Sequence, residues 1–258
     1  MLSYQHIYHA GNLADVQKHA LLAFMLDYMT RKDKPLSYIE THAGRGVYDL
    51  TAPEAAKTGE AAAGISLLEQ RFPPDHPYRQ RLAQTRALFG PNAYPGSPLV
   101  AALGLRETDA IHLAELHPQE HAALTRAMGQ WGLHIEKRDG LEMALALTPP
   151  TPRRGLLLID PSYEVKTDYQ TLPKLVGQIA RKWNVGTIAL WYPILVDGPH
   201  TPMLRELMAA HPDSFRHELR FPPVRDGHKM IGTGMWILNP PYGIEAEAAA
   251  LSALYKTL

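Results

Sequence analysis

The sequence contains no cysteine, carries no net charge and has no long apolar run. The absence of cysteine excludes disulfides, thiolate metal ligands and cysteine nucleophiles. The 26 basic and 26 acidic side chains cancel, so any RNA binding must come from local basic patches. No apolar run approaches the roughly 20 residues that span a bilayer, and residues 1–6 lack the features of a signal peptide. We therefore expect a soluble, cytoplasmic protein with no membrane partner.

The composition is that of an ordinary globular enzyme. Hydrophobic residues make up 45% of the 258 residues and charged residues 20%, which argues against disorder. This length suits one large domain, which we place over residues 1–258, with room for a small insertion. We expect a monomer that binds no metal.

Seven short apolar runs bounded by turn residues are typical of buried strands. They are Leu36–Glu40, Ala110–Glu115, His134–Lys137, Gly155–Asp160, Thr187–Trp191, Phe215–Phe221 and Gly234–Leu238. Helical patterns separate many of them, at Ala14–Thr30, Gln119–Gln130, Leu141–Leu147, Leu172–Trp183 and Met203–His211. This alternation predicts an α/β fold with a mostly parallel, seven-stranded sheet and helices on both faces. The last two runs are joined without a helix, which suits an antiparallel hairpin at a sheet edge.

One stretch breaks the alternation. Residues 48–98 show no good strand, but Ala61–Phe72 and Tyr78–Phe89 both have apolar residues at helical spacing. We interpret residues 48–98 as a small inserted helical subdomain within the single domain.

Two elements along the chain have the character of a nucleotide-type cofactor site. Gly44 and Gly46 form a Gly-x-Gly loop after the first strand, where glycines let the backbone turn sharply and approach a ligand. Glu115 ends the next strand, where an acid can accept hydrogen bonds from ribose hydroxyls. It lies further along the chain than usual, and the insertion explains the excess. Both also have plainer interpretations, as a loop glycine pair and a solvated acid.

A third element, Asp139-Gly140, follows another short strand. An aspartate there can accept a hydrogen bond from an adenine amino group. Asp-Gly is also a common turn, and the pattern alone favours the turn.

The fourth element, Asp160-Pro161-Ser162-Tyr163, follows a buried strand and points to the chemistry. An exocyclic adenine amine is a poor nucleophile because its lone pair is delocalised into the ring. Two acceptors on the amino hydrogens restore nucleophilic character, and the Asp160 carboxylate and the Pro161 carbonyl can supply them. Tyr163 can stack on the extruded base. The plainer interpretation is an ordinary strand-to-loop turn.

Two other segments match known patterns by letter. Asn239-Pro240-Pro241-Tyr242 follows the last strand, with no cofactor acid after it, and we interpret it as a turn that ends the sheet. His117-Pro118-Gln119-Glu120-His121 matches an inverted zinc-protease pattern. Pro118 would occupy the first helical position there, which makes His117 a capping residue off the shared helix face.

With these elements in place, the sequence resembles the RlmJ family of bacterial 23S ribosomal RNA adenine-N6 methyltransferases over essentially its whole length. The matching segments are Tyr4, His9–His19, Thr41–Gly44, Glu115–Pro118, Asp139–Gly140 and Asp160–Glu164. The opening segment and Thr41–Gly44 are specific, whereas Asp139–Gly140 is not. The resemblance implies a class I, Rossmann-like methyltransferase fold with a helical insertion, S-adenosylmethionine as cofactor and 23S ribosomal RNA as partner.

The resemblance also implies residue roles. Asp160 would be the catalytic acceptor beside the cofactor, and Tyr4 would contact the RNA. Cofactor contacts are implied at His19, His42, Ser97, Glu115, Asp139 and Gly140. The usual family pattern is Asp-Pro-Pro-Tyr, and Ser162 here replaces the second proline, which removes rigidity and adds an N–H. The main chemistry should survive, because the carbonyl acceptor belongs to Pro161.

Candidate RNA contacts come from basic and aromatic residues beside the expected catalytic face. They are Tyr4, Lys18, Arg45, Tyr163 and the loop Arg225–Lys229 with His228. Two other functions stay open. A DNA adenine-N6 methyltransferase would use the same four elements, although no separate target-recognition domain is evident. A non-catalytic RNA-binding protein on a methyltransferase scaffold would not need Glu115 and Asp160 intact.

Overall fold

The computed structural model describes residues 4–222, 227 and 229–258. Its centre is a seven-stranded sheet in the order β5-β4-β1-β6-β7-β9-β8. Six strands of this sheet run in one direction, and β9 runs in the opposite direction. The strands are β1 Ser37–Glu40, β4 Ala110–Ala114, β5 His134–Glu136, β6 Gly155–Ile159, β7 Thr187–Leu195, β8 Phe215–Arg220 and β9 Met230–Leu238. All seven expected strands and the closing antiparallel hairpin are therefore confirmed.

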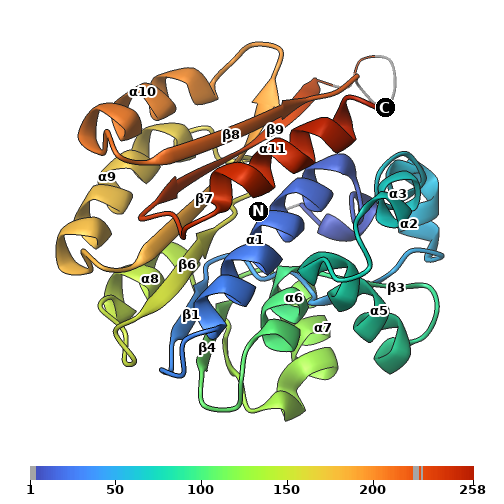
Figure 1. Ribbon diagram of the computed structural model, residues 1–258, viewed down its shortest axis with the longest axis horizontal. Helices are drawn as coiled ribbons and strands as arrows, with labels where there is room; N and C mark the ends of the chain where they lie inside the picture. Colours follow the sequence, from blue (N-terminus) through green and yellow to red (C-terminus); the bar gives the residue numbers. More distant parts are fainter. Residues whose placement is uncertain (1–3, 223–226, 228) are drawn as a thin grey trace.

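Helices cover both faces of the sheet, as expected (Figure 1). One face carries α1 Leu13–Thr30, α5 Pro77–Phe89, α6 Ser97–Gly104, α7 Pro118–Met128 and α11 Ile244–Tyr255. The other face carries α8 Gly140–Leu147, α9 Asp168–Lys182 and α10 His200–Ala210. Side chains alternate between the two resulting cores along a strand, as in β6, where Leu156 and Leu158 face the first core and Leu157 and Ile159 the second.

The segment between β1 and β4 is only partly the helical insertion that the sequence predicts. The expectation of no strand there is wrong, because β2 Val47–Asp49 and β3 Ala93–Pro95 pair antiparallel. Strands of three residues are too short to show a two-residue period. The helix expected at Tyr78–Phe89 is confirmed as α5, which packs into the first core. The division at residues 48–98 stays an interpretation.

The other helix expected in this segment is broken into short pieces. α3 Glu60–Ala63, α4 Ile65–Leu68 and the 3-10 turn η2 Glu69–Arg71 replace it, after α2 Pro53–Thr58. The break lies at Gly64, where a Cβ atom would collide with the carbonyl oxygen of Gly11. The chain therefore bends to let the N-terminal segment pass close by.

Helix α1 brings polar side chains into the interior. Asn12 caps it by accepting a hydrogen bond from the Asp15 N–H at 2.8 Å. The first turns of α1 bury Asp15, Gln17, Lys18 and His19, although charged groups are rarely buried without partners. Asp15, Lys18 and His19 face the cavity described next, whereas Gln17 is hydrogen-bonded to His217 of β8. Within the part of the chain that the structure describes, no helix has the length and apolarity of a bilayer span.

Candidate active site

A cavity of about 520 Å³ lies at the carboxyl ends of the parallel strands β1, β4, β5 and β6. Parallel strands deliver their following loops to one edge of the sheet, which is where ligands bind in such folds. The loops meet there the N-terminal segment and the start of α1. The cavity is lined by most of the site residues expected from the sequence, but not by Arg45 or Gly46. Those that line it are Tyr4, Lys18, His19, His42, Gly44, Ser97, Glu115, Asp139, Gly140, Asp160, Pro161 and Tyr163.

Glu115 ties the glycine loop to the end of β4. Its Oε2 accepts a hydrogen bond from the Gly44 N–H at 2.8 Å, and its Oε1 accepts one from the His117 N–H at 2.7 Å. Burial raises the pKa of Glu115 above its ordinary value, although these two N–H groups oppose the shift. Each carboxylate oxygen keeps a second lone pair, so Glu115 can also accept hydrogen bonds from two ligand hydroxyls.

Backbone conformation explains the glycines around this carboxylate. Gly44 has a φ of 60°, in the left-handed region where a side chain is strained. At Gly140, a Cβ atom would overlap the carbonyl oxygen of Thr41. Only glycine lets the start of α8 approach the loop after β1 this closely.

Asp139 serves first as a helix cap. Its Oδ1 accepts hydrogen bonds from the N–H groups of Leu141 at 2.8 Å and Glu142 at 3.1 Å, which satisfies the free end of α8. The turn that the pattern favoured is thus present. Because Oδ1 already accepts these two hydrogen bonds, a ligand amino group would donate its hydrogen bond to Oδ2.

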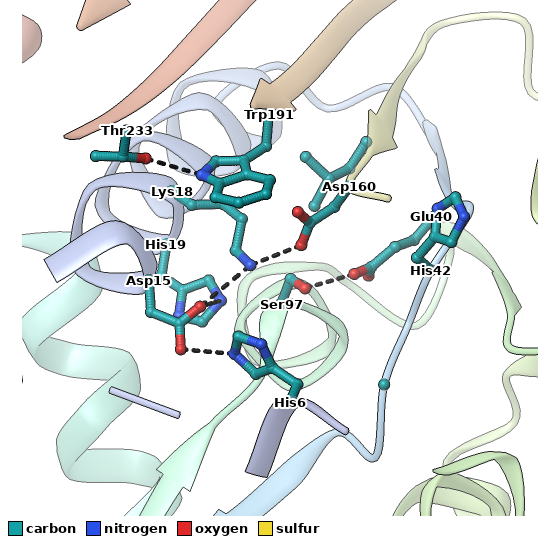
Figure 2. Close-up of polar contacts among 12 residues, drawn as sticks. His6, Asp15, Lys18, His19, Glu40, His42, Ser97, Asp160, Trp191 and Thr233 are labelled. Carbon is teal, nitrogen blue, oxygen red and sulfur yellow. Dashed lines mark hydrogen bonds and ion pairs between the residues drawn. The ribbon is translucent and has the colours of Figure 1, made fainter. Parts of the chain in front are cut away.

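Asp160 forms a close ion pair with Lys18. The Lys18 ammonium lies 2.6 Å from Asp160 Oδ2 and 3.1 Å from Asp15 Oδ1, with the side chain of Lys18 only 6% exposed (Figure 2). It also lies 5.7 Å from the ring centre of Trp191, whose indole N–H donates to Thr233 at 2.8 Å. Burial alone would lower the pKa of Lys18, but the two carboxylates raise it above its ordinary value. A cation therefore stands beside the expected catalytic acceptor.

Glu40, which ends β1, is a buried carboxyl group behind the cavity wall. It receives a hydrogen bond from Ser97 Oγ (Figure 2). A second comes from Tyr38 Oη at 2.8 Å. No cation lies within salt-bridge distance of it among the residues that the structure describes. Burial raises the pKa of Glu40 to about 8, despite these two hydrogen bonds. Ser97 thus joins the cavity to a buried acid.

This raised pKa predicts a pH-dependent stability. The folded state holds a proton that the unfolded chain releases above about 4.5, so the contribution of Glu40 is full below that pH and lost as pH rises through about 8. The slope reaches about 1.4 kcal/mol per pH unit. Glu40→Gln cannot ionise, so its melting temperature relative to the natural protein should rise across this window. Melts of both proteins measure it, with Glu245→Gln on the surface of α11 as control. A difference independent of pH would contradict the protonated state.

Tyr163 forms part of the cavity wall. Its ring stacks on Tyr169 with centroids 4.5 Å apart, and its hydroxyl donates to the carbonyl oxygen of Trp191 at 2.7 Å. The residue has a φ of 56°, which is uncommon for a bulky side chain. One face of the ring is therefore already covered, and stacking of a base on Tyr163 stays a prediction.

The residues expected to contact RNA are placed differently from a simple basic patch. Lys18 is directed at Asp160 inside the cavity. The guanidinium of Arg45 is held by Glu120, with Nε 2.9 Å from Oε2. Lys229 lines the cavity, whereas Arg225 and His228 lie outside the described residues. Lys18 and Arg45 are therefore both held by carboxylates of the protein itself.

Several polar and aromatic residues of this cavity were not expected from the sequence. Asp15, His6 and Trp191 all line it, and Asp15 is 1% exposed. His6 lies just before the segment His9–His19, and Asp15 lies in the first turn of α1, where an acid is common in any helix. The feature that distinguishes Asp15 is its burial, and burial of a single acid on a helix cannot be recognised from the sequence.

Of the two segments that match other motifs by letter, Asn239–Tyr242 does not line the cavity, whereas His117 and Glu120 of the other do. Since β9 is antiparallel to β7, its end brings Asn239 to the opposite edge of the sheet, where Asn239 Nδ2 donates to the carbonyl of Gly186 at 2.8 Å. That interpretation as a terminal turn is confirmed. His117 is the N-cap residue of α7, with Pro118 first in the helix, also as expected.

Comparisons with known proteins agree with this arrangement. The family model described as "Ribosomal RNA large subunit methyltransferase D, RlmJ" matches residues 33–258. The chain is 38% identical to "Ribosomal RNA large subunit methyltransferase J" of Escherichia coli strain K12, over 96% of this chain and 90% of the relative. It is 36% identical to the protein of the same name from Haemophilus influenzae, over 100% and 94%. A crystal structure from Legionella pneumophila, 35% identical, superimposes with a TM-score of 0.87 over 96% of this chain and 93% of that one.

Proposed function

Because this chain belongs to the RlmJ family of large-subunit ribosomal RNA methyltransferases, we propose that it methylates the N6 amino group of an adenine in 23S ribosomal RNA. S-adenosylmethionine is the methyl donor. The resemblance noted in the sequence is confirmed by the family match, and the enzyme class follows from it. The observation that supports this proposal most directly is that Asp160 and Pro161 line the same cavity as Gly44 of the glycine loop and Glu115.

The residues present fit this cofactor. His117 Nδ1 is buried beside the cavity and has no hydrogen-bond partner among the described residues, so it can meet a polar ligand atom. Glu115 has spare lone pairs for ribose hydroxyls, and Gly44 and Gly140 let the backbone come close. We assign His19, His42, Ser97 and Asp139 to the same group of cofactor contacts, as the family resemblance implies.

The chain's own groups act on the target amine. Bound S-adenosylmethionine supplies a methyl group on a positively charged sulfur. The Asp160 carboxylate and the Pro161 carbonyl accept the two amino hydrogens, which localises the nitrogen lone pair for attack. Lys18 occupies Asp160 Oδ2, which leaves Oδ1 for the amine. Positive charge that develops on the nitrogen is stabilised by these acceptors.

The function is tested by methyl transfer to RNA and DNA of equal sequence. We expect N6-methyladenine in a 23S ribosomal RNA transcript and little or none in the matching DNA. Transfer to DNA alone would favour the DNA methyltransferase, and failure to bind S-adenosylmethionine would favour a non-catalytic RNA-binding protein. Mass-spectrometric mapping of 23S RNA from cells that lack the protein would identify the nucleotide. We propose that the protein acts in the cytoplasm and as a monomer.

Glu115 should contribute to cofactor affinity. Glu115→Ala removes the acceptors for the ribose hydroxyls and leaves those donors unpaired, which should weaken binding by roughly 1–3 kcal/mol. Calorimetry with S-adenosylmethionine measures the change, and Glu142→Ala, an exposed acid on α8, is the control. If a folded Glu115→Ala protein bound S-adenosylmethionine as tightly as the natural protein does, Glu115 would not be part of the cofactor site.

A further inference from the structure

The carboxylate of Asp15 lies at the centre of a buried hydrogen-bond network in the cavity (Figure 2). Its Oδ2 accepts hydrogen bonds from the Gly11 N–H at 2.9 Å and from His6 Nε2 at 2.8 Å. Its Oδ1 lies 3.1 Å from the Lys18 ammonium and 3.8 Å from His19 Nε2. Three donors thus surround one acid that is 1% exposed, whereas His19 Nε2 lies beyond hydrogen-bond distance.

Asp15 is ionised in this setting. Burial alone would raise the pKa of Asp15, but the adjacent His6 and Lys18 outweigh it and hold this pKa well below its ordinary value. An ionised carboxylate can only accept hydrogen bonds. Each neighbour must therefore turn a hydrogen toward it.

This requirement fixes the orientation of two further groups. His6 Nε2 must carry a hydrogen toward Asp15, and in a ring with one N–H the other nitrogen, Nδ1, is then an acceptor. The Tyr4 hydroxyl lies 2.8 Å from that Nδ1 and must then donate to it. The oxygen of Tyr4 consequently offers only lone pairs to the cavity. The tautomer of His6 decides whether Tyr4 presents an acceptor or a donor there.

The second effect of Asp15 is on Lys18. The ammonium is held between two carboxylates, at 3.1 Å from Asp15 and 2.6 Å from Asp160. His19 does not compete for this place, because its Nδ1 bonds the hydroxyl of Tyr94 at 2.9 Å and burial lowers its pKa to about 3. Asp15 therefore contributes one of the two anchors that direct Lys18 at the reacting group.

We propose that Asp15 is a positioning residue of the methyl-transfer site, which holds Lys18 against Asp160 and selects the ring nitrogen that His6 offers to Tyr4. The link to methyl transfer rests on the function proposed above. The orientation of His6 does not, because it follows from hydrogen bonds within the protein. Asp15 acts through its neighbours in the same way as a buried carboxylate that orients a catalytic histidine.

Asp15→Asn tests the proposal with almost no change of volume. The asparagine amide can donate to His6 Nε2, so the ring should change from the Nε2–H to the Nδ1–H tautomer, which nitrogen NMR of labelled imidazoles detects. Turnover of methyl transfer should fall by about ten- to a hundredfold, whereas affinity for S-adenosylmethionine should stay within a few fold. A purely structural role would not move the tautomer.

Asp27→Asn is the matched control, because Asp27 lies on the same helix but is exposed and paired with Arg31. It should leave the His6 tautomer and turnover unchanged. An Nδ1–H tautomer in the natural protein, or full turnover in folded Asp15→Asn, overturns the proposal. If Asp15→Asn fails to fold, the tautomer of the natural protein still decides. An Nε2–H tautomer in a protein that methylates no RNA would support the orienting role of Asp15 and overturn the proposed function instead.

Discussion

Asp160→Ala should abolish most methyl transfer while leaving cofactor affinity within a few fold. In the proposed mechanism the carboxylate is one of two acceptors that act mainly on the transition state, so its loss should lower turnover by about a hundredfold or more. Lys18 keeps its second carboxylate at 3.1 Å, which limits damage to the fold. Single-turnover transfer to 23S RNA measures the rate, calorimetry the cofactor affinity, and thermal melts the stability.

Asn239→Ala is the control that separates the two similar turns. Asn239 lies at the opposite edge of the sheet, where its amide bonds the carbonyls of Asn184 and Gly186 at 3.1 and 2.8 Å. Its loss should cost about 0.5–3 kcal/mol of stability and leave turnover nearly intact. An active Asp160→Ala beside an inactive, folded Asn239→Ala would overturn the site.

Ser162→Pro would restore the usual family pattern next to Asp160. No hydrogen bond from the Ser162 N–H is found within the described residues, so the proline removes no bond seen there. We expect a folded protein with turnover at or above that of the natural chain, because proline stiffens the turn. A large loss of turnover would show that the serine is needed.

Most of the fold could be predicted because the strands are short apolar runs between turn residues. This signal depends only on neighbours in the sequence, and it placed β6 within one residue of Gly155–Ile159. The same signal fails where elements are very short, as in β2 and β3. No helix was expected at α11 either, although Ile244, Ala248, Leu251 and Tyr255 recur there at helical spacing and are buried.

The site was predictable where strand ends supply it. Parallel strands bring Glu115 and Asp160 to one edge whatever their loops do, so their meeting follows from the fold class. The pairing of Lys18 with Asp160 joins residues 142 positions apart and depends on where α1 lies over the sheet. No local pattern encodes that placement. The sequence therefore suggested RNA as the partner of Lys18, whereas the structure shows a carboxylate inside the cavity.

Lys18→Met should destabilise the protein by about 3–5 kcal/mol, because it leaves buried carboxylates without their cation. Asp15 keeps hydrogen bonds from Gly11 and His6, so the larger loss falls on Asp160, whose carboxylate is hydrogen-bonded by Lys18 alone among the described residues. The methionine fills most of the lysine volume, which keeps cavity formation small. Denaturant melts at neutral pH measure the change.

A second substitution distinguishes lost charge pairing from lost contacts. In Lys18→Met with Asp160→Asn neither member of the pair is charged, so the double variant should be more stable than Lys18→Met alone. Removal of one partner of a buried pair costs more than removal of both. On the same helix, Arg31→Met breaks the exposed pair with Asp27, and exposed pairs contribute only about 0–1 kcal/mol. If Lys18→Met and Arg31→Met lowered the free energy of unfolding equally, the ion pair with Asp160 would not stabilise the fold. Lys18 would then have a role in the reaction only.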